Sequence, residues 1–240
     1  MKLHIFPEPA AVLALGISIA MNGCSRNQAA SMNTLSDEQR GTGWQLLFDG
    51  HSMREWRGYK RSSVPEGWKI VDGTMTKDNV TGDIITRDQF GDFELELEWK
   101  LGPGGNSGIF YRGTEEYEYI YWSAPEYQLI DDATNADGGN RLTSAGASYG
   151  LYPAPAGILK PANEWNAARI LVRGNHVEHW MNGQKLLEYE LGSPAWQEKV
   201  RSSKFADWPS YGKSRQGHIG IQGDHEGPLS LRNLRIRELH

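Results

Sequence analysis

The segment from residue 92 to residue 100, DFELELEWK, constrains the fold of this chain more than any other. Apolar and charged residues alternate along it, and in an extended strand the side chains at every second position share one face. One face therefore carries Phe93, Leu95, Leu97 and Trp99, and the other carries Glu94, Glu96, Glu98 and Lys100. The segment predicts a β-strand with one buried face and one face in water.

The same period of two recurs between short turns along most of the chain. Further strands are predicted at Trp68–Val71, Ser107–Arg112, Tyr127–Ile130, Ile170–Arg173, His176–Met181, Lys185–Tyr189 and from Leu229 to Arg237. The turns between them contain Asp72-Gly73, Gly174-Asn175 and Asn182-Gly183, and Asn-Gly is typical of two-residue hairpins. Helical signals are sparse, with one short helix predicted over Ser193–Val200. About a dozen short strands without βαβ spacing predict an all-β, two-sheet sandwich, in which one curved sheet could cradle a ligand.

The N-terminal region carries the signals for targeting. An apolar run, Ala10–Met21, precedes Cys24, which is the only cysteine of the chain. The run is too short to span a membrane, so residues 1–23 are predicted to be a lipoprotein signal peptide and Cys24 the lipidated residue. The alternative is an ordinary cleaved signal with a chance cysteine. Ser25 after the cysteine favours delivery to the outer membrane, so the prediction is a lipid-anchored protein of the cell envelope, at the outer membrane or on the periplasmic side.

Domain organisation and partners follow from composition. The polar residues 24–42 are predicted to be a flexible tether, and residues 43–240 a single domain. The formal net charge is −5, which argues against a nucleic-acid partner because phosphate binding needs clustered Lys and Arg. No glycine-rich phosphate loop is present. A membrane is expected as a partner only through the lipid.

Four segments place polar groups beside glycines and aromatic residues: GGNSGIFYRG from Gly104, PEYQLIDD from Pro125, Trp165-Asn166, and GHIGIQGDHEGP from Gly217. A carboxylate such as Glu126, together with Arg112 and His225, would supply a proton acceptor, a cation for developing oxyanion charge and an imidazole that titrates near neutrality. A purely structural Glu126–Arg112 ion pair explains the same residues.

Two other kinds of site are weaker. The acids Glu94, Glu96 and Glu98 superficially match a retaining glycosidase, but neighbouring members lie about 6 to 7 Å apart along a strand, and such a pair needs about 5 to 5.5 Å. A solvated strand face explains them better. Asp131, Asp132, Asp224 and His225 are possible metal ligands, yet they lack a metal-binding spacing. No metal or other cofactor is predicted, although a divalent metal stays an open alternative.

Seven motifs in order resemble the 3-keto-disaccharide hydrolase family, also described as 3-keto-glucoside 1,2-lyase and 3-keto-2-hydroxyglucal hydratase. They are WQLLFDG from Trp44, NSGIFYRG from Asn106, PEYQLIDD from Pro125, YGLYP from Tyr149, KPANEWN from Lys160, GNHVEHWMNG from Gly174, and GHIGIQGDHEGP followed by LRNLRIREL. The resemblance runs from about Trp44 to the C-terminus. It implies a concanavalin A-like jelly-roll sandwich, export or lipidation, and 3-keto sugar substrates.

The resemblance also implies roles for individual residues. Glu126 and His225 would be the proton-transfer pair, without a decision on which is the base, and Arg112 would lie near the substrate carbonyl or a hydroxyl. The expected substrate-binding residues are Asn106, Gln128, Asp131, Gln222 and Trp165. A non-catalytic carbohydrate-binding module and a conventional retaining glycosidase remain the alternatives.

Overall fold

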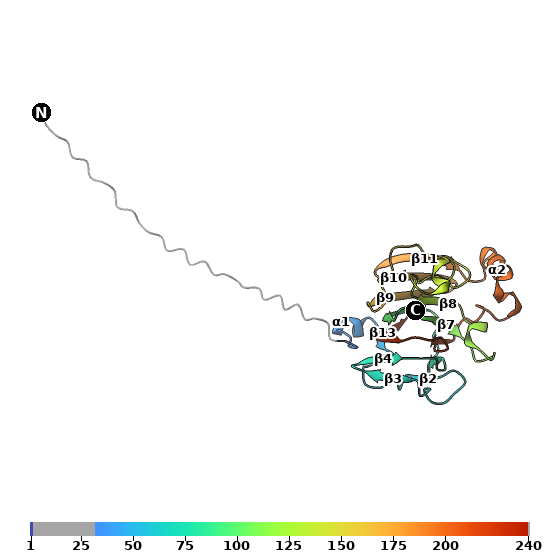
Figure 1. Ribbon diagram of the computed structural model, residues 1–240, viewed down its shortest axis with the longest axis horizontal. Helices are drawn as coiled ribbons and strands as arrows, with labels where there is room; N and C mark the ends of the chain where they lie inside the picture. The colour runs from blue at the N-terminus through green and yellow to red at the C-terminus, as the bar shows by residue number, and fades with distance from the viewer. Residues whose placement is uncertain (2–31, 240) are drawn as a thin grey trace. The chain divides into compact units, whose positions relative to one another are not determined.

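The computed structural model describes Met1 and residues 32–239, and within this part almost all regular structure is antiparallel β-sheet. The larger sheet has the order β11 (Gln184–Glu190), β10 (His176–Met181), β9 (Asn166–Arg173), β6 (Phe93–Leu101), β13 (Leu229–Glu238), β4 (Thr74–Lys77) and β3 (Trp68–Val71), with β1 (Gln45–Leu46) paired to β13. The smaller sheet has the order β2 (Trp56–Gly58), β5 (Ile84–Thr86), β12 (His218–Ile221), β7 (Asn106–Gly113) and β8 (Glu126–Ile130). Figure 1 shows β9 to β11 at one end of the domain and β3 and β4 at the other.

Helices in the described residues are short and lie in the connections. They are α1 (Asp37–Gly41), α2 (Pro194–Arg201) and the 3₁₀ turns η1 (Ile120–Trp122), η2 (Ala136–Gly139) and η3 (Lys204–Asp207). The Ser193 hydroxyl accepts a hydrogen bond from the backbone N–H of Trp196, and Pro194 occupies the first turn, so α2 begins where the sequence predicted. No helix of the described chain has the length and apolar character that a membrane span requires.

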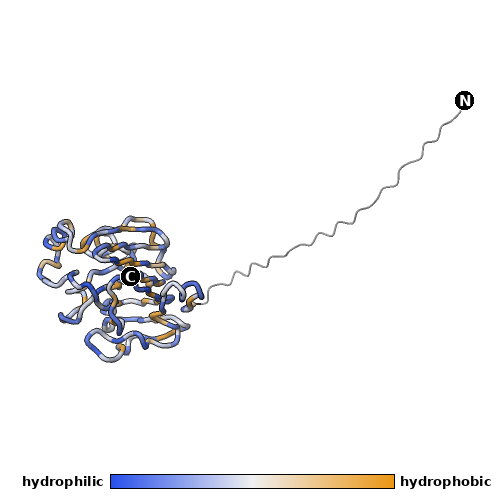
Figure 2. The backbone as a smooth tube through the Cα atoms, turned by 180° about the vertical axis from the view of Figure 1, so that it is seen from behind, coloured by the Kyte–Doolittle hydropathy of each residue, from blue (hydrophilic) through white to orange (hydrophobic). Residues whose placement is uncertain are grey.

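The core between the sheets forms from the inward-facing residues of both. On β6, Phe93, Leu95, Leu97 and Trp99 are buried, as the alternation predicted. The smaller sheet contributes Ile109, Tyr111, Tyr127 and Leu129 to the same apolar cluster. In Figure 2 hydrophobic and hydrophilic residues follow one another along the chain of the domain, which is the pattern that a sandwich requires. The prediction of an all-β two-sheet sandwich is confirmed.

The glutamates on the outer face of β6 form ion pairs with arginines instead of contacting water alone. Glu94 accepts hydrogen bonds from Arg169 and Arg237, Glu96 accepts from Arg235, and Glu98 accepts from Arg232. Three of these four arginines lie on the neighbouring strand β13. The carboxylates are therefore held as ion pairs, which supports the structural interpretation of this face and leaves the glycosidase alternative without a free acid pair.

The boundary of the domain differs from the prediction. Residues 2–31, with the predicted signal peptide, Cys24 and most of the predicted tether, lie outside the described residues, as does His240. Residues 33–42, however, are part of the fold. Asn33 exchanges two backbone-to-side-chain hydrogen bonds of 2.7 Å with Asn233 and donates a third to the Gly73 carbonyl, and Ser36 and Gln39 form a capping box at α1. The prediction of a tether up to residue 42 is wrong for this segment, because these polar groups have specific partners far along the chain.

Candidate active site

A polar pocket of about 190 Å³ lies on the side of the smaller sheet that faces away from the core. Its floor comes from the strand ends of β7, β8 and β12, and its walls come from η3 and from loops. The lining residues are Asn106, Tyr121, Glu126, Gln128, Asp137, Tyr149, Lys204, Phe205, Gln222, Asp224 and His225. Alternation along β8 explains its orientation, since Tyr127 and Leu129 point into the core while Glu126 and Gln128 point into the pocket.

Glu126 is the most perturbed acid of this pocket. It is 7% exposed, and no group among residues 32–239 donates a hydrogen bond to its carboxyl. Burial raises the pKa of Glu126 to about 8, the cation of Lys204 acts in the opposite direction, and Asp224 and Asp83 raise it further. A carboxyl with a pKa near neutrality can exchange a proton under physiological conditions, which is the property that general acid or base catalysis needs.

A missing side chain makes room for this carboxyl. Gly108 on β7 lies opposite Gln128 and diagonal to Glu126, and a Cβ placed on Gly108 would lie 2.0 Å from the Glu126 Oε1. No real carbon approaches an oxygen so closely without displacing it. The glycine of the NSGIFYRG motif therefore acts through the space that it leaves for the acid.

Three amide side chains surround the acid. The Gln128 Nε2 donates to the Asn106 Oδ1 at 3.1 Å, whereas the Gln128 Oε1 and the Gln222 Oε1 are buried without a hydrogen-bond partner in the described chain. An unpaired buried acceptor costs about 1–3 kcal/mol, so such groups persist mainly where a ligand or water satisfies them. The hydroxyl groups of a sugar are suitable donors.

The loop that carries Asp224 and His225 is held from beneath by a buried lysine and a half-buried acid. The Lys77 Nζ donates to the carbonyls of His225 at 2.6 Å and Gly227 at 3.1 Å, and the Asp83 Oδ1 accepts from the Gly223 N–H at 2.8 Å. Burial lowers the pKa of Lys77 and raises that of Asp83 to about 7. The loop is thus rigidly supported while the His225 side chain stays 42% exposed at the pocket, 3.8 Å from the Asp224 carboxylate.

The structure thus brings together five of the predicted site residues: Glu126, His225, Asn106, Gln128 and Gln222. Their roles stay predictions. Sequence reasoning missed Lys204, whose ammonium lies 4.4 Å from the centre of the Tyr149 ring at the pocket wall. The KF dipeptide after α2 carries no motif, and only folding brings it to β8.

Arg112 does not lie in this pocket, so the prediction that it joins Glu126 is wrong. Its side chain is 3% exposed and donates to the carbonyls of Gly91 at 2.9 Å and Gly174 at 2.8 Å and to the Asp92 carboxylate at 2.9 Å. The cause is local, since Arg112 has φ of +53° beside an irregular register between β7 and β12. This bulge interrupts the alternation and turns the guanidinium away. The structural Glu126–Arg112 pair is excluded by the same contacts.

Arg112 therefore contributes to stability. We expect Arg112→Met to lower the free energy of unfolding by about 2–3 kcal/mol, because it removes the ion pair with Asp92 and the donors to two backbone carbonyls. Urea denaturation measures this loss. Arg173→Met, which removes an exposed arginine at the end of β9, should change the value by less than about 0.5 kcal/mol. A normally stable Arg112→Met protein that has lost its activity would contradict this assignment.

Two further predicted ligand-binding residues also lie elsewhere. Asp131 is 5% exposed and accepts hydrogen bonds from the Gly104 and Ala133 N–H groups and the Thr134 hydroxyl. Burial raises the pKa of Asp131, but the hydrogen bonds outweigh it and lower the pKa below its ordinary value. Asp131 stabilises a turn. Trp165 packs against Lys100 and the guanidinium of Arg232 on the outer side of the larger sheet. Neither lines the pocket, so the structure does not bring them together with Glu126.

Metal binding at the pocket has no geometric support in the described residues. Among the described residues, one group has possible ligand atoms within 4.8 Å of one another, and it lies away from the pocket on β10 and β11: His176, Glu178 and Glu188. These side chains already bond to Glu190, Trp180 and Lys185. The expectation that the protein needs no metal stays a prediction.

Comparison with known proteins gives a consistent result. The chain is 34% identical to a 3-keto-disaccharide hydrolase of Bacteroides thetaiotaomicron, over 92% of this chain and 87% of the relative. A crystal structure from Parabacteroides distasonis superimposes with a TM-score of 0.82 at 32% identity, covering 87% of this chain and all of the other, and a second from the same organism gives 0.63 at 30% identity over 82% and 99%. A galectin-like protein from Bacillus subtilis, 12% identical with a TM-score of 0.50 over 87% and 95%, shares the fold alone.

The family match covers the whole sandwich. Residues 43–237 match the family described as 3-keto-alpha-glucoside-1,2-lyase-like domain, and this span includes every residue of the pocket. The chain therefore belongs to the 3-keto-alpha-glucoside-1,2-lyase-like family.

Proposed function

We propose that the protein is an exported enzyme that cleaves 3-keto-glycosides by proton abstraction at C2, β-elimination and hydration. The observation that carries the proposal is the buried Glu126 carboxyl, whose pKa of about 8 and lack of hydrogen-bond donors suit a base that works near neutral pH. A relative named as a 3-keto-disaccharide hydrolase supports the substrate class.

The chemistry begins at the ketone. A carbonyl at C3 acidifies the hydrogen on C2, and the Glu126 carboxylate removes it to give an enolate. The enolate electrons form the C1–C2 double bond as the C1–O bond breaks, and the leaving oxygen takes a proton. Water then adds its hydroxyl to C1 and a proton returns to C2, so the sum is hydrolysis without any change in oxidation state.

The pocket offers groups for each of these needs. Lys204 is a cation at the pocket wall that opposes the rise in the pKa of Glu126, so we assign to it the electrophilic role at the C3 oxygen that the family resemblance implied for Arg112. His225 is exposed at the pocket beside Asp224, and we assign to His225 the protonation of the leaving oxygen. Gln128, Gln222 and Asn106 would hold the sugar hydroxyls. Export and lipidation at Cys24 rest on the N-terminal sequence.

Incubation with a 3-keto-glucoside and with its parent glucoside tests the proposal. We expect turnover of the keto sugar only, because the parent has no carbonyl to acidify the C2 hydrogen. Release of the free aglycone, measured by chromatography, gives the rate. Binding of the keto sugar without turnover would instead indicate a carbohydrate-binding module, and cleavage of the parent a conventional glycosidase.

A further inference from the structure

Tyr149, the first residue of the YGLYP motif, lines the candidate active site and has no role in the proposed function. Its backbone N–H donates to the Glu126 carbonyl at 3.1 Å, and Ser148 before it forms an isolated β-bridge with Tyr127. The Tyr149 ring is half-buried and packs against the core. The strand that carries the catalytic acid therefore also sets the position of this ring.

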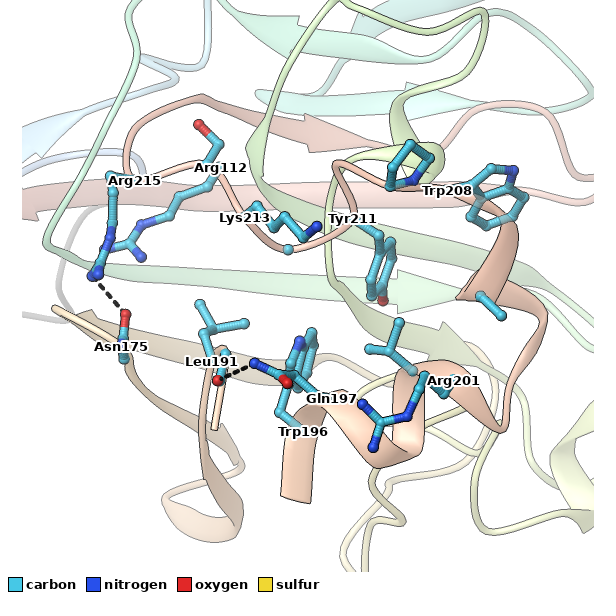
Figure 3. A pocket seen from close by; sticks show the side chains of 16 residues that line it. Arg112, Asn175, Leu191, Trp196, Gln197, Arg201, Trp208, Tyr211, Lys213 and Arg215 are labelled. Atoms are coloured by element: carbon cyan, nitrogen blue, oxygen red, sulfur yellow. Dashed lines mark hydrogen bonds between the residues drawn. The ribbon is translucent and has the colours of Figure 1, made fainter. Parts of the chain in front are cut away.

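On the opposite wall, Lys204 combines an anchored backbone with an unanchored ammonium. The next residue, Phe205, is 2% exposed and stacks on Tyr211, with ring centroids 4.2 Å apart. Tyr211 in turn stacks on Trp196, and both line the neighbouring cavity shown in Figure 3. This aromatic stack holds η3 in place. The long, flexible lysine side chain beyond it makes no hydrogen bond or ion pair in the described chain.

The contacts of the Lys204 ammonium are aromatic faces. Its Nζ lies 4.4 Å from the centre of the Tyr149 ring and 5.5 Å from that of Phe205. A ring face attracts a cation through its quadrupole but carries no net charge, whereas a carboxylate partner would neutralise the lysine. The ammonium is thus oriented while its full charge stays available to an oxyanion that forms in the pocket.

The Tyr149 phenol stays uncharged. Burial raises the pKa of Tyr149, and the negative charges of Glu126 and Asp137 raise it further. The remaining charged groups of the pocket, Asp224 and His225, lie on the loop after β12. Tyr149 therefore attracts Lys204 through its neutral ring and does not act as a phenolate near neutral pH.

We propose that Tyr149 is a positioning residue of the active site, whose ring face holds the Lys204 ammonium in the pocket without neutralising it. This role rests on the proposed function, since it concerns the electrophilic group assigned to the C3 oxygen. It requires the aromatic ring of Tyr149 and not its hydroxyl.

Steady-state kinetics of the full-length protein on a 3-keto-glucoside tests this role. Tyr149→Leu should lower kcat at least about 10-fold, because the flexible lysine then leaves the pocket, whereas Tyr149→Phe keeps the ring and should keep kcat within about threefold. Tyr152→Leu is the matched control. Tyr152 is also half-buried, and its ring lies 4.9 Å from the Lys199 Nζ, but it does not line the pocket, so kcat should stay within about twofold.

A double-mutant cycle separates positioning from a general structural effect. Lys204→Met should lose at least about 10²-fold in kcat, and adding Tyr149→Leu to it should cost less than about twofold more, because the group that Tyr149 holds is already gone. An undiminished further loss in that background, or a loss in Tyr149→Phe equal to that in Tyr149→Leu, would overturn the proposal. Wild-type kcat in Tyr149→Leu or in Lys204→Met would overturn it as well, while leaving Glu126 as the base.

NMR titration of the Glu126 carboxyl distinguishes failure of this role from failure of the proposed function, because it needs no turnover. Lys204 lowers the pKa of Glu126, so Tyr149→Leu should raise that pKa as much as Lys204→Met does, and Tyr149→Phe should leave it near the wild-type value. A wild-type protein that cleaves no 3-keto-glucoside would refute the proposed function. An unchanged pKa of Glu126 in Tyr149→Leu would overturn the positioning role in either case.

Discussion

Glu126→Gln should lose about 10²–10⁴-fold in kcat on a 3-keto-glucoside while keeping its fold, because the amide cannot accept the C2 proton. Its stability should not fall, since the carboxyl makes no hydrogen bond among the described residues and its burial is costly. Initial rates and urea denaturation of both proteins measure the two effects. A variant that keeps near wild-type kcat would show that Glu126 is not the base.

The pH profile belongs to the same prediction. A base must be unprotonated, and burial raises the pKa of Glu126 to about 8, so kcat/KM should rise with pH and level off above about 8. Below that value each pH unit should cost about tenfold in rate. The rising limb should vanish in Glu126→Gln. A rate that instead falls above pH 8 in the wild type alone would make Glu126 the acid.

Gly108→Ala should lower kcat/KM by about 10²-fold, which is the cost of displacing a catalytic group by roughly 1 Å. The new methyl would overlap the Glu126 Oε1, 2.0 Å from the ideal Cβ position, and Gly108 lies in a strand with an ordinary φ, so the backbone itself tolerates alanine. Steady-state kinetics with a 3-keto-glucoside measures the loss.

Two comparisons isolate the clash as the cause. Gly139→Ala introduces the same methyl where no atom lies within 4 Å, and it should keep its activity. In a Glu126→Ala background, Gly108→Ala should change the urea midpoint little, because the atom that it would strike is gone. If Gly108→Ala destabilised that background as much as the wild type, the methyl would clash with something other than the acid.

The strands were predictable because their signal is local. The sequence predicted His176–Met181 and Trp68–Val71 with the bounds that the structure has, and the other predicted strands differ at their ends by a few residues. Buried and exposed faces follow from a period of two, which needs no knowledge of the partner strand. The jelly-roll arrangement, by contrast, was an implication of family motifs rather than of periodicity.

The candidate site was only partly predictable. Glu126 and Gln128 share a face by alternation, and the motif at Gly217 brought in Gln222 and His225. Arg112 and Asp131 belong to equally suggestive motifs, but a bulge and a turn engage them in backbone contacts. The residue types in a motif do not show whether their side chains are already hydrogen-bonded within the protein.

The sequence by itself determined that this chain is a β-sandwich with polar motifs at its strand ends, since side-chain alternation is a property of each strand alone. The tertiary structure decided the rest. It folded residues 33–42 onto the domain, paired Arg112 with Asp92, and placed Lys204 beside Glu126 in a site that buries the acid. Burial and partner choice depend on residues distant in the chain, and it is burial that raises the pKa of Glu126.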